Sequence, residues 1–554
     1  MNVNKYFSKN KDESIKQINN ILDTLNKNVK TKITNDEKPI LDGGVKLYNK
    51  FLKDKHIPQE PRNIKSVLSD FSNYFERSVI WENPGTMINI TPPANIPSIA
   101  TAFYASLFNP NFAQDEPSGY LMTTELLVSK YLSELCEWDI KKSRGIFTFG
   151  GKGTNLYAVK TGIKKAIPNV IEEGITGKEI VVFSNEKSHP CHREVCDWLG
   201  LGKNACHRLS VDENGQVNLE LLEKDLRKAL DEGKIIGCII LNGGTTNEII
   251  VDPIKPVYEL RNKLVKEYKL DYIPHIHIDA VIGWVWLMFK NYDYNKNALK
   301  MTETEYKKIH SLCKKISEVK YADSFGADFH KTGFCPYVSS IYMAKNYDDV
   351  MKLGNKTDKG VENLSFGEYS PFEYTLELTR SCVGPVAAYT ALETFGIGGL
   401  QTLVYNVFSN AEYTRNYLNK QKDFEVINMD TEGIATLFIV KTPENDKNYN
   451  DYVKGDSKDL SKLLDYNQQF YLFTLKKLEE GKINFKMAFS KSYKPYGASM
   501  PTGALKIYCM SPIISKKETE KILKEIINLK EEFDHYSKLL KEDREVPIDY
   551  VYRD

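Results

Sequence analysis

The chain has 554 residues, which is enough for two or three compact domains with full-sized cores. Lys and Arg number 75 against 74 Asp and Glu, for a formal net charge of +1. This balance excludes the strongly basic surface typical of proteins that bind nucleic acid or anionic membranes. We therefore expect a globular protein whose partners are small molecules or other proteins.

Cysteine use and hydropathy predict the compartment. The nine cysteines are spread along the chain without a CxxC pair, which indicates neither a disulfide framework nor a structural zinc site. Residues 1–30 carry charges throughout, and the longest apolar run, residues 280–289, is too short to cross about 30 Å of hydrocarbon. We expect a cytoplasmic protein that neither binds metal nor enters a membrane.

Three domains are predicted in chain order. Residues 1–115 form an N-terminal helical arm, in which apolar residues recur at intervals of three and four from Ile15 to Leu25. Residues 116–395 form a large α/β domain. Residues 396–554, which begin at the glycine-rich GIGGL segment, form a smaller C-terminal α/β domain.

The large domain is expected to contain a mostly parallel sheet. A helix capped by Thr123 opens it, and four short β-branched runs follow, at residues 146–149, 179–184, 234–241 and 275–280. Helical segments, such as the one that begins at Leu219, alternate with these runs. Strands that alternate with helices predict a parallel sheet covered by helices on both faces.

Two candidate site segments follow predicted strands, where open parallel sheets bind ligands. The first, TFGGKGTN at residues 148–155, places Gly151, Lys152 and Gly153 at a helix start. Free N–H groups there favour a phosphate, but the spacing is not that of a Walker loop. The second places His189 at a loop edge, where its ring could lie against an aromatic ligand, and the cysteines and histidines near it match no usual zinc spacing.

Two further segments carry an acid and a lysine. The apolar run HIHIDA ends in Asp279, and a buried carboxylate at a strand end needs a cationic or strongly donating partner, such as a protonated ring nitrogen. Lys331 lies between turn-forming residues and the apolar strand YVSSIYMA. A lysine near apolar or cationic neighbours loses its proton more easily and can form a Schiff base.

Each segment alone also has a structural interpretation. The glycines could simply begin a helix, His189 could be structural, Asp279 could cap a helix, and Lys331 could be a solvated turn lysine. Together, however, they supply a phosphate cradle, a stacking ring, an acid for a pyridinium and a Schiff-base lysine. These are the protein groups that pyridoxal phosphate requires.

On these residues the chain resembles the group II pyridoxal-phosphate-dependent amino acid decarboxylases, which have the fold type I, aminotransferase-like architecture. The resemblance covers roughly residues 85–400. The motifs that carry it are residues 150–155, His189 with Leu199 and Gly200, residues 244–246, residues 277–280, and His330 with Lys331.

The resemblance implies a role for each motif residue. Lys331 would form the Schiff base with pyridoxal 5'-phosphate, Asp279 would pair with its pyridine nitrogen, and His189 would stack on its ring. Gly151, Lys152 and Gly153 would line the phosphate. His330 and Thr246 would lie near the cofactor or the substrate carboxylate.

The sequence also departs from the family pattern. Lys152 and Gly153 stand where a small hydroxyl or acidic residue is usual, and Val281 and Trp284 stand where a second Ala and a second Gly are common. These differences affect the expected phosphate contacts and pocket width. Trp284 and Trp286 could line an aromatic pocket or belong to the core.

The resemblance implies decarboxylation of an L-amino acid, with an aromatic one as a candidate, in a homodimer whose active site lies at the subunit boundary. A loop tyrosine would return the proton, and we expect Tyr369 in this role, with Tyr374 as a weaker second candidate. Three rival functions share the fold: a carbon–carbon lyase, an aminotransferase and a non-catalytic binding protein. The lyase is a rival because residues 327–331 also resemble sphingosine phosphate lyases.

Overall fold

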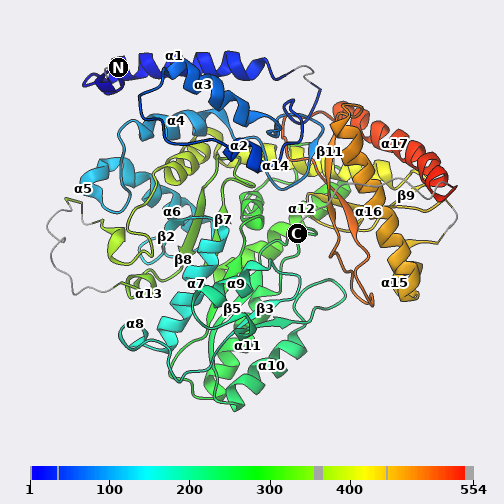
Figure 1. The fold of residues 1–554 in the computed structure, drawn as a ribbon. Helices are drawn as coiled ribbons and strands as arrows, with labels where there is room; N and C mark the ends of the chain where they lie inside the picture. Colours follow the sequence, from blue (N-terminus) through cyan, green and yellow to red (C-terminus); the bar gives the residue numbers. More distant parts are fainter. Residues whose placement is uncertain (1–2, 34–36, 355–365, 368, 444–446, 543–554) are drawn as a thin grey trace.

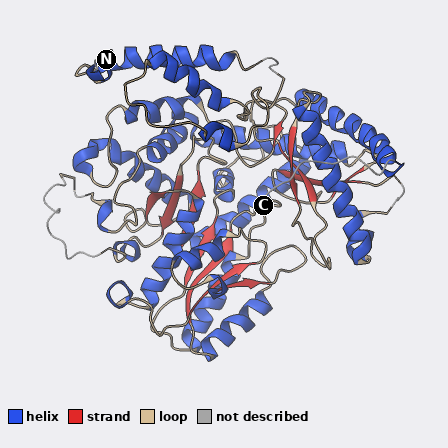
Figure 2. Cartoon of the chain, in the orientation of Figure 1, coloured by secondary structure: helices blue, strands red, loops and turns tan. Residues whose placement is uncertain are grey.

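The computed structural model describes residues 3–33, 37–354, 366–367, 369–443 and 447–542. The strands form two separate groups (Figure 2), a seven-stranded sheet and a five-stranded sheet. The first four α-helices are α1 (Lys11–Lys30), α2 (Tyr48–Leu52), α3 (Ile64–Ser72) and α4 (Ile96–Ser106). The N-terminal helices lie along one side of the molecule (Figure 1).

The seven-stranded sheet has the order β2-β8-β7-β6-β5-β3-β4. Its strands are β2 (Arg144–Thr148), β3 (Ile180–Asn185), β4 (Cys206–Leu209), β5 (Ile235–Asn242), β6 (His275–Asp279), β7 (Ser324–Asp328) and β8 (Ser340–Ala344). The five neighbouring strands β4, β3, β5, β6 and β7 pair in parallel, whereas β8 pairs antiparallel with both β7 and β2. The mostly parallel sheet predicted from the sequence is therefore confirmed.

Helices cover both faces of this sheet. They are α5 (Asp115–Ser118), α6 (Thr123–Leu135), α7 (Gly151–Ala166), α8 (Val170–Glu173), α9 (Cys191–Trp198), α10 (Leu219–Asp231), α11 (Ile254–Glu267), α12 (Glu303–Ile316), α13 (Asp348–Met351) and α14 (Val383–Leu418). Successive strand residues alternate between two cores, so that Val182 packs with α7 on one face while Val181 and Phe183 pack with α10 and α11 on the other. The core thus has two layers separated by the sheet.

The expected cap of one helix needs correction. Helix α6 begins at Thr123, but Met122 occupies the N-cap position and no side chain caps the helix. At the GIGGL segment, α14 is interrupted by a kink at Gly396, whose φ of 56° is non-helical. The predicted start of the C-terminal domain falls at this kink.

The five-stranded sheet has the order β1-β11-β12-β10-β9. Its strands are β1 (Thr86–Met87), β9 (Phe424–Val426), β10 (Ala435–Val440), β11 (Lys486–Ser490) and β12 (Ala504–Tyr508), and its helices are α15 (Tyr449–Lys454), α16 (Ser457–Glu479) and α17 (Lys516–Glu542). Strand β1 pairs in parallel with β11. The small sheet therefore includes a strand from residues 1–115, the segment predicted to be an N-terminal helical arm.

Short 3-10 helices occupy several connections. They are Val3–Tyr6, Asn73–Phe75, Gly119–Met122, Lys203–Ala205, Gly283–Phe289, Ser317–Tyr321 and Pro371–Glu373. In the one at Gly283–Phe289, Trp284 and Trp286 are both fully buried in the main core. They do not line an aromatic pocket, because their side chains are enclosed by other apolar groups. No helix in the described ranges is long and apolar enough to cross a membrane.

Candidate active site

A cavity of about 220 Å³ opens at the carboxyl ends of the central parallel strands. Asn242 ends β5, Asp279 ends β6 and Asp328 ends β7, and Asn242 lies opposite Asp279 in the sheet register. The residues that line it are Gly151, Lys152, Asn155, His189, Cys191, Asn242, Gly244, Thr245, Thr246, Asp279, Val281, Ile282, Asp328, His330, Lys331 and Tyr337. Parallel strands place their ligand-binding groups at this edge.

Asp279 is a buried carboxylate held by two donors. Its Oδ2 accepts hydrogen bonds from His192 Nε2 at 2.9 Å and Asn155 Nδ2 at 3.2 Å. Burial would raise the pKa of Asp279, but the hydrogen bond from His192 and the nearby Lys331 cation outweigh burial and keep that pKa well below its usual range. Asp279 is therefore ionised, as predicted for an acid that meets a cationic ring.

Lys331 is paired with an acid that the sequence did not single out. Its Nζ lies 3.0 Å from Asp328 Oδ2, and Asp328 is itself buried and accepts a hydrogen bond from Ser340 Oγ at 2.5 Å. Burial alone would lower the pKa of Lys331, but Asp328 and then Asp279 reverse this and raise it. The expectation that its neighbours favour the neutral amine is wrong for the protein alone, because those neighbours are anionic.

The glycine segment lies at the start of α7, beside Lys331. Gly150 has a φ of +129°, a conformation that side chains disfavour. A Cβ on Gly151 would lie 3.0 Å from Asp328 Oδ2 and 3.2 Å from Val281 Cγ1, so any larger residue here would crowd the acid that pairs with Lys331. Gly153 does not line the cavity, because its Cα faces Thr148, whose side chain would lie 2.8 Å from an added Cβ.

The Lys152 side chain turns toward α9. It forms an ion pair with Glu194, and its Nζ lies 4.8 Å from the ring centre of Trp198. Lys152 still contributes to the cavity wall. What this helix start offers an anion is therefore mainly backbone N–H groups rather than a free lysine charge.

Three other predicted residues reach the cavity. His189 and Thr246 line it from the β3 and β5 ends, and His189 Nδ1 accepts a hydrogen bond from Cys191 N at 3.1 Å. His330 Nδ1 accepts one from Ser339 N at 3.2 Å, and its ring lies 4.1 Å from that of Tyr337. Burial lowers the pKa of His330, so its ring is neutral near pH 7.

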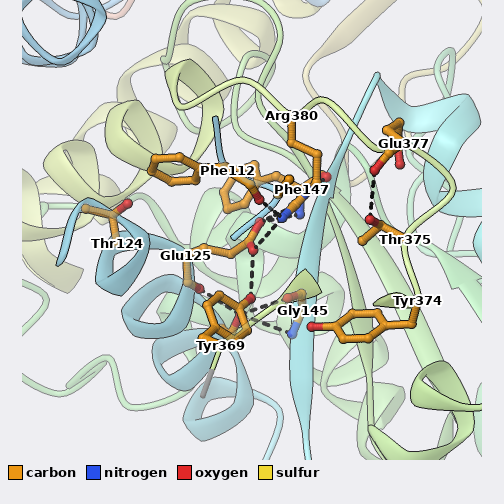
Figure 3. A network of polar contacts seen from close by, with 12 residues as sticks. Phe112, Thr124, Glu125, Gly145, Phe147, Tyr369, Tyr374, Thr375, Glu377 and Arg380 are labelled. Carbon is orange, nitrogen blue, oxygen red and sulfur yellow. Dashed lines mark hydrogen bonds and ion pairs between the residues drawn. The ribbon is translucent and has the colours of Figure 1, made fainter. Parts of the chain in front are cut away.

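Tyr369 lies in a different part of the molecule. Its Oη donates to Glu125 Oε1 at 2.7 Å, and Arg380 Nη1 donates to the same oxygen at 3.1 Å. Figure 3 shows Glu125 between Tyr369 and Arg380. Tyr374 instead contacts Tyr347, and neither Tyr369 nor Tyr374 lines the cavity.

The surroundings of Tyr369 differ from those of a loop residue free to enter the site. The resemblance implies a loop tyrosine, whereas the phenol of Tyr369 is buried against a carboxylate. Burial first, and then Glu125, raise the pKa of Tyr369 well above its usual value. Residues 355–365 and 368, which precede it, lie outside the described residues. The role of Tyr369 in proton transfer stays a prediction.

Four residues of the site received no role from the sequence. Asn155, Asn242 and Asp328 line the cavity, and His192 contacts Asp279 from outside its lining. Asn155 and Asp328 lie inside the motif segments, Asn242 follows the predicted strand at 234–241 and ends the observed β5, and His192 was considered only as a metal ligand. The donor atoms of Cys191, His192 and Asp279 lie within 4.8 Å of one another. Burial raises the pKa of the Cys191 thiol, which keeps it protonated and makes it a poor metal ligand. The signal that could have found Asn242 is its position as the last residue of a core strand.

The Glu125 contact gives a prediction for Tyr369. Replacing Tyr369 with Phe leaves Glu125 Oε1 with one donor fewer in a buried site, so we expect a loss of about 1–3 kcal/mol in the free energy of unfolding. Urea unfolding measures it, with the exposed Tyr104→Phe as the control. Unchanged stability with strongly reduced turnover of the folded variant would instead support proton transfer by Tyr369.

Comparisons with known proteins agree with this geometry. A family model described as the pyridoxal-dependent decarboxylase conserved domain matches residues 47–441. An L-2,4-diaminobutyrate decarboxylase of Rhizobium meliloti (strain 1021) is 22% identical over 66% of this chain and 68% of its own. An aromatic-L-amino-acid decarboxylase of Bacillus atrophaeus is 23% identical over 69% and 73%.

One further relative is similar in sequence, and two solved structures are similar in fold. The acidic amino acid decarboxylase GADL1 of Xenopus tropicalis is 26% identical, in an alignment that spans 45% of this chain and 46% of that relative. Mouse CSAD in its apo form has a TM-score of 0.74 at 17% identity, covering 93% of this chain and 99% of CSAD. Oryza sativa TDC with PLP and tryptamine has a TM-score of 0.74 at 13% identity, covering 95% and 99%. The chain belongs to the pyridoxal-dependent decarboxylase family.

Proposed function

We propose that this protein uses pyridoxal 5'-phosphate, held by Lys331, to remove the carboxylate of an L-amino acid as carbon dioxide and release the amine. The observation that carries the proposal is the ionised, buried Asp279 beside Lys331 in one cavity. A buried carboxylate is costly unless a cation or strong donor meets it. A protonated ring nitrogen would be that donor.

The cavity fits this cofactor. Three buried polar atoms on its wall residues lack a hydrogen-bond partner among the described residues, and these are Asn155 Oδ1, Asn242 Nδ2 and Asp279 Oδ1. A bound polar ring would satisfy such atoms. The start of α7 offers N–H groups to a phosphate.

The position of each residue in the cavity determines its role. When bound, pyridoxal phosphate supplies an electron-accepting ring on which the bond to the substrate carboxylate can break. Asp279 keeps a proton on the ring nitrogen, Lys331 holds the cofactor, and His189 covers the ring. The helix start at Gly151 binds the phosphate, with Lys152 at its edge, and Thr246 and His330 face the substrate.

The substrate class is an L-amino acid. The names of the relatives specify acidic amino acids, diaminobutyrate and aromatic amino acids as substrates. These substrates differ in their side chains and share only the amino acid group. Aromatic amino acids are the first to test, because the Tyr337 ring on the cavity wall is 54% exposed and can stack with another ring.

An exposed apolar face on α4 supports a homodimer. On α4, the apolar residues Ile96, Ile99 and Phe103 lie on one helix face and are 80%, 48% and 42% exposed. The start of α4 is tied to the active-site segment, because Asn95 donates two hydrogen bonds to Phe334 O. A second copy seated on this face would lie next to Tyr337 at the cavity wall.

A cytoplasmic location completes the proposal. All nine cysteines are buried and free, which suits a reducing compartment.

The first test is an absorption spectrum followed by borohydride reduction and peptide mapping. With pyridoxal phosphate added, we expect a violet absorption band that borohydride abolishes, a label on Lys331, and release of carbon dioxide and an amine from a substrate amino acid. The Lys331→Ala variant should show none of these. A keto acid or an aldehyde as product would contradict decarboxylation and favour an aminotransferase or a carbon–carbon lyase.

Asp328 gives a prediction with a definite pH direction. In Asp328→Asn the acid that raises the pKa of Lys331 is gone and burial dominates, so this pKa falls. A lower pKa enlarges the neutral amine fraction near pH 7, by about tenfold for each unit. Pyridoxal phosphate should therefore attach to the apo-variant faster than to the wild type.

Stopped-flow absorbance across a pH series measures this effect. The midpoint of the rate profile should move to lower pH, whereas the exposed Asp293→Asn should leave it unchanged. A midpoint that stays in place or rises would show that Asp328 does not control the charge of Lys331.

The dimer is tested on α4. The Phe103→Glu variant places a charge in the apolar face, so sedimentation velocity should show monomers with reduced activity. The control is Leu221→Glu on α10, a residue that is 40% exposed on another helix and should stay dimeric. A monomeric wild-type protein with full activity would contradict the proposal.

A further inference from the structure

The imidazole ring of His192 contacts Asp279 without lining the cavity. His192, in the first turn of α9, is fully buried, and its Nε2 lies 2.9 Å from Asp279 Oδ2. It does not line the cavity. His192 therefore contacts the carboxylate from outside the cavity lining, and it can reach a bound ligand only through Asp279.

The hydrogen bonds fix where the protons of His192 lie. Ser184 Oγ lies 2.7 Å from His192 Nδ1, and Arg208 Nη1 donates to the same hydroxyl oxygen at 3.1 Å. Because an arginine only donates, the Ser184 proton remains available for His192 Nδ1. His192 Nε2 then carries the proton that an ionised Asp279 must accept.

Arg208 is itself held in place. Its Nη2 donates to the backbone oxygens of Glu186 at 2.8 Å and Ser188 at 2.6 Å. The row Arg208, Ser184, His192, Asp279 thus runs from β4 through β3 and α9 to the end of β6. Each member donates to the next, so the proton positions are consistent along the row.

The consequence appears at the two oxygens of Asp279. His192 and Asn155 both donate to Oδ2, whereas Oδ1 is buried without a partner among the described residues. One oxygen is therefore saturated and the other is left for a ligand in the cavity. A carboxylate without the His192 bond could rotate or take up a proton.

We propose that His192 is a positioning residue that, with Ser184 and Arg208 behind it, fixes the charge and orientation of Asp279 toward the cofactor's ring nitrogen. The inference rests on the proposed function, since it concerns how this chain binds pyridoxal phosphate. It predicts that the contribution of His192 to cofactor affinity depends on that nitrogen. A merely structural histidine would affect every ligand of the cavity alike.

The test compares two ligands that differ in one ring atom. Equilibrium dissociation constants are measured on apo-protein for pyridoxal phosphate and for its analogue with carbon in place of the ring nitrogen. We expect His192→Phe to weaken pyridoxal phosphate binding by roughly tenfold or more and to leave the analogue's affinity nearly unchanged. His192→Gln, which retains a side-chain donor, should recover part of the loss.

Two further variants keep the test decisive. Ser184→Ala retains the imidazole but removes its hydroxyl partner. It should lose part of the preference for pyridoxal phosphate over the analogue, by less than His192→Phe does. This variant tests the inference if His192→Phe does not fold. The control is His207→Phe on β4, whose ring packs against Phe183. Circular dichroism and thermal unfolding verify that each variant is folded.

The outcomes separate this inference from the proposed function. Equal weakening of both ligands in the folded His192 and Ser184 variants, or no weakening of either, would overturn the role of His192 while leaving the function intact. Failure of the wild-type protein to bind pyridoxal phosphate at Lys331 would overturn the proposed function instead.

Discussion

The negative charge of Asp279, buried at the end of a core strand, is the interaction on which the site depends. An ionised carboxylate in such a place is unstable without donors, and the surrounding chain supplies them from α7 and α9. The charge also holds Lys331 protonated, together with Asp328. Without the cofactor, the two carboxylates of Asp279 and Asp328 therefore lie near the single cation of Lys331.

The sheet makes this arrangement possible. Residues Asn242, Asp279 and Asp328 end three adjacent strands and so face one cavity, although the chain between them contains several helices. Helix α7 then brings its glycine start against Asp328, where a Cβ on Gly151 would lie 3.0 Å from Asp328 Oδ2. Residues far apart in the sequence meet because parallel strands end at one edge.

The sequence predicts those parts of the site that depend on strand ends. Asp279 could be found because a carboxylate interrupts an apolar run, and Lys331 because it precedes an apolar strand. The charge state of Lys331 could not be found, because it depends on how the turn folds Lys331 back onto Asp328.

Other features depend on contacts that no local pattern contains. Tyr369 is held by Glu125, which precedes it by 244 positions, and a polar segment gives no sign of such a partner. The role of His192 depends on which way α9 faces. The predicted parallel sheet and flanking helices were confirmed, because alternation of strands and helices is a local property of the sequence. The two-residue strand β1 is too short to give a pattern.

The pairing of β1 with β11 has a consequence for how the chain matures. Thr86 lies beside Lys486, and Arg77 forms an ion pair with Glu479, so the small sheet needs segments made early and late in synthesis. While the ribosome is still making the middle of the chain, β1 has no partner, and its edge is exposed to other chains. Completion of this sheet, rather than of the parallel one, is the event that must wait for nearly the whole polypeptide.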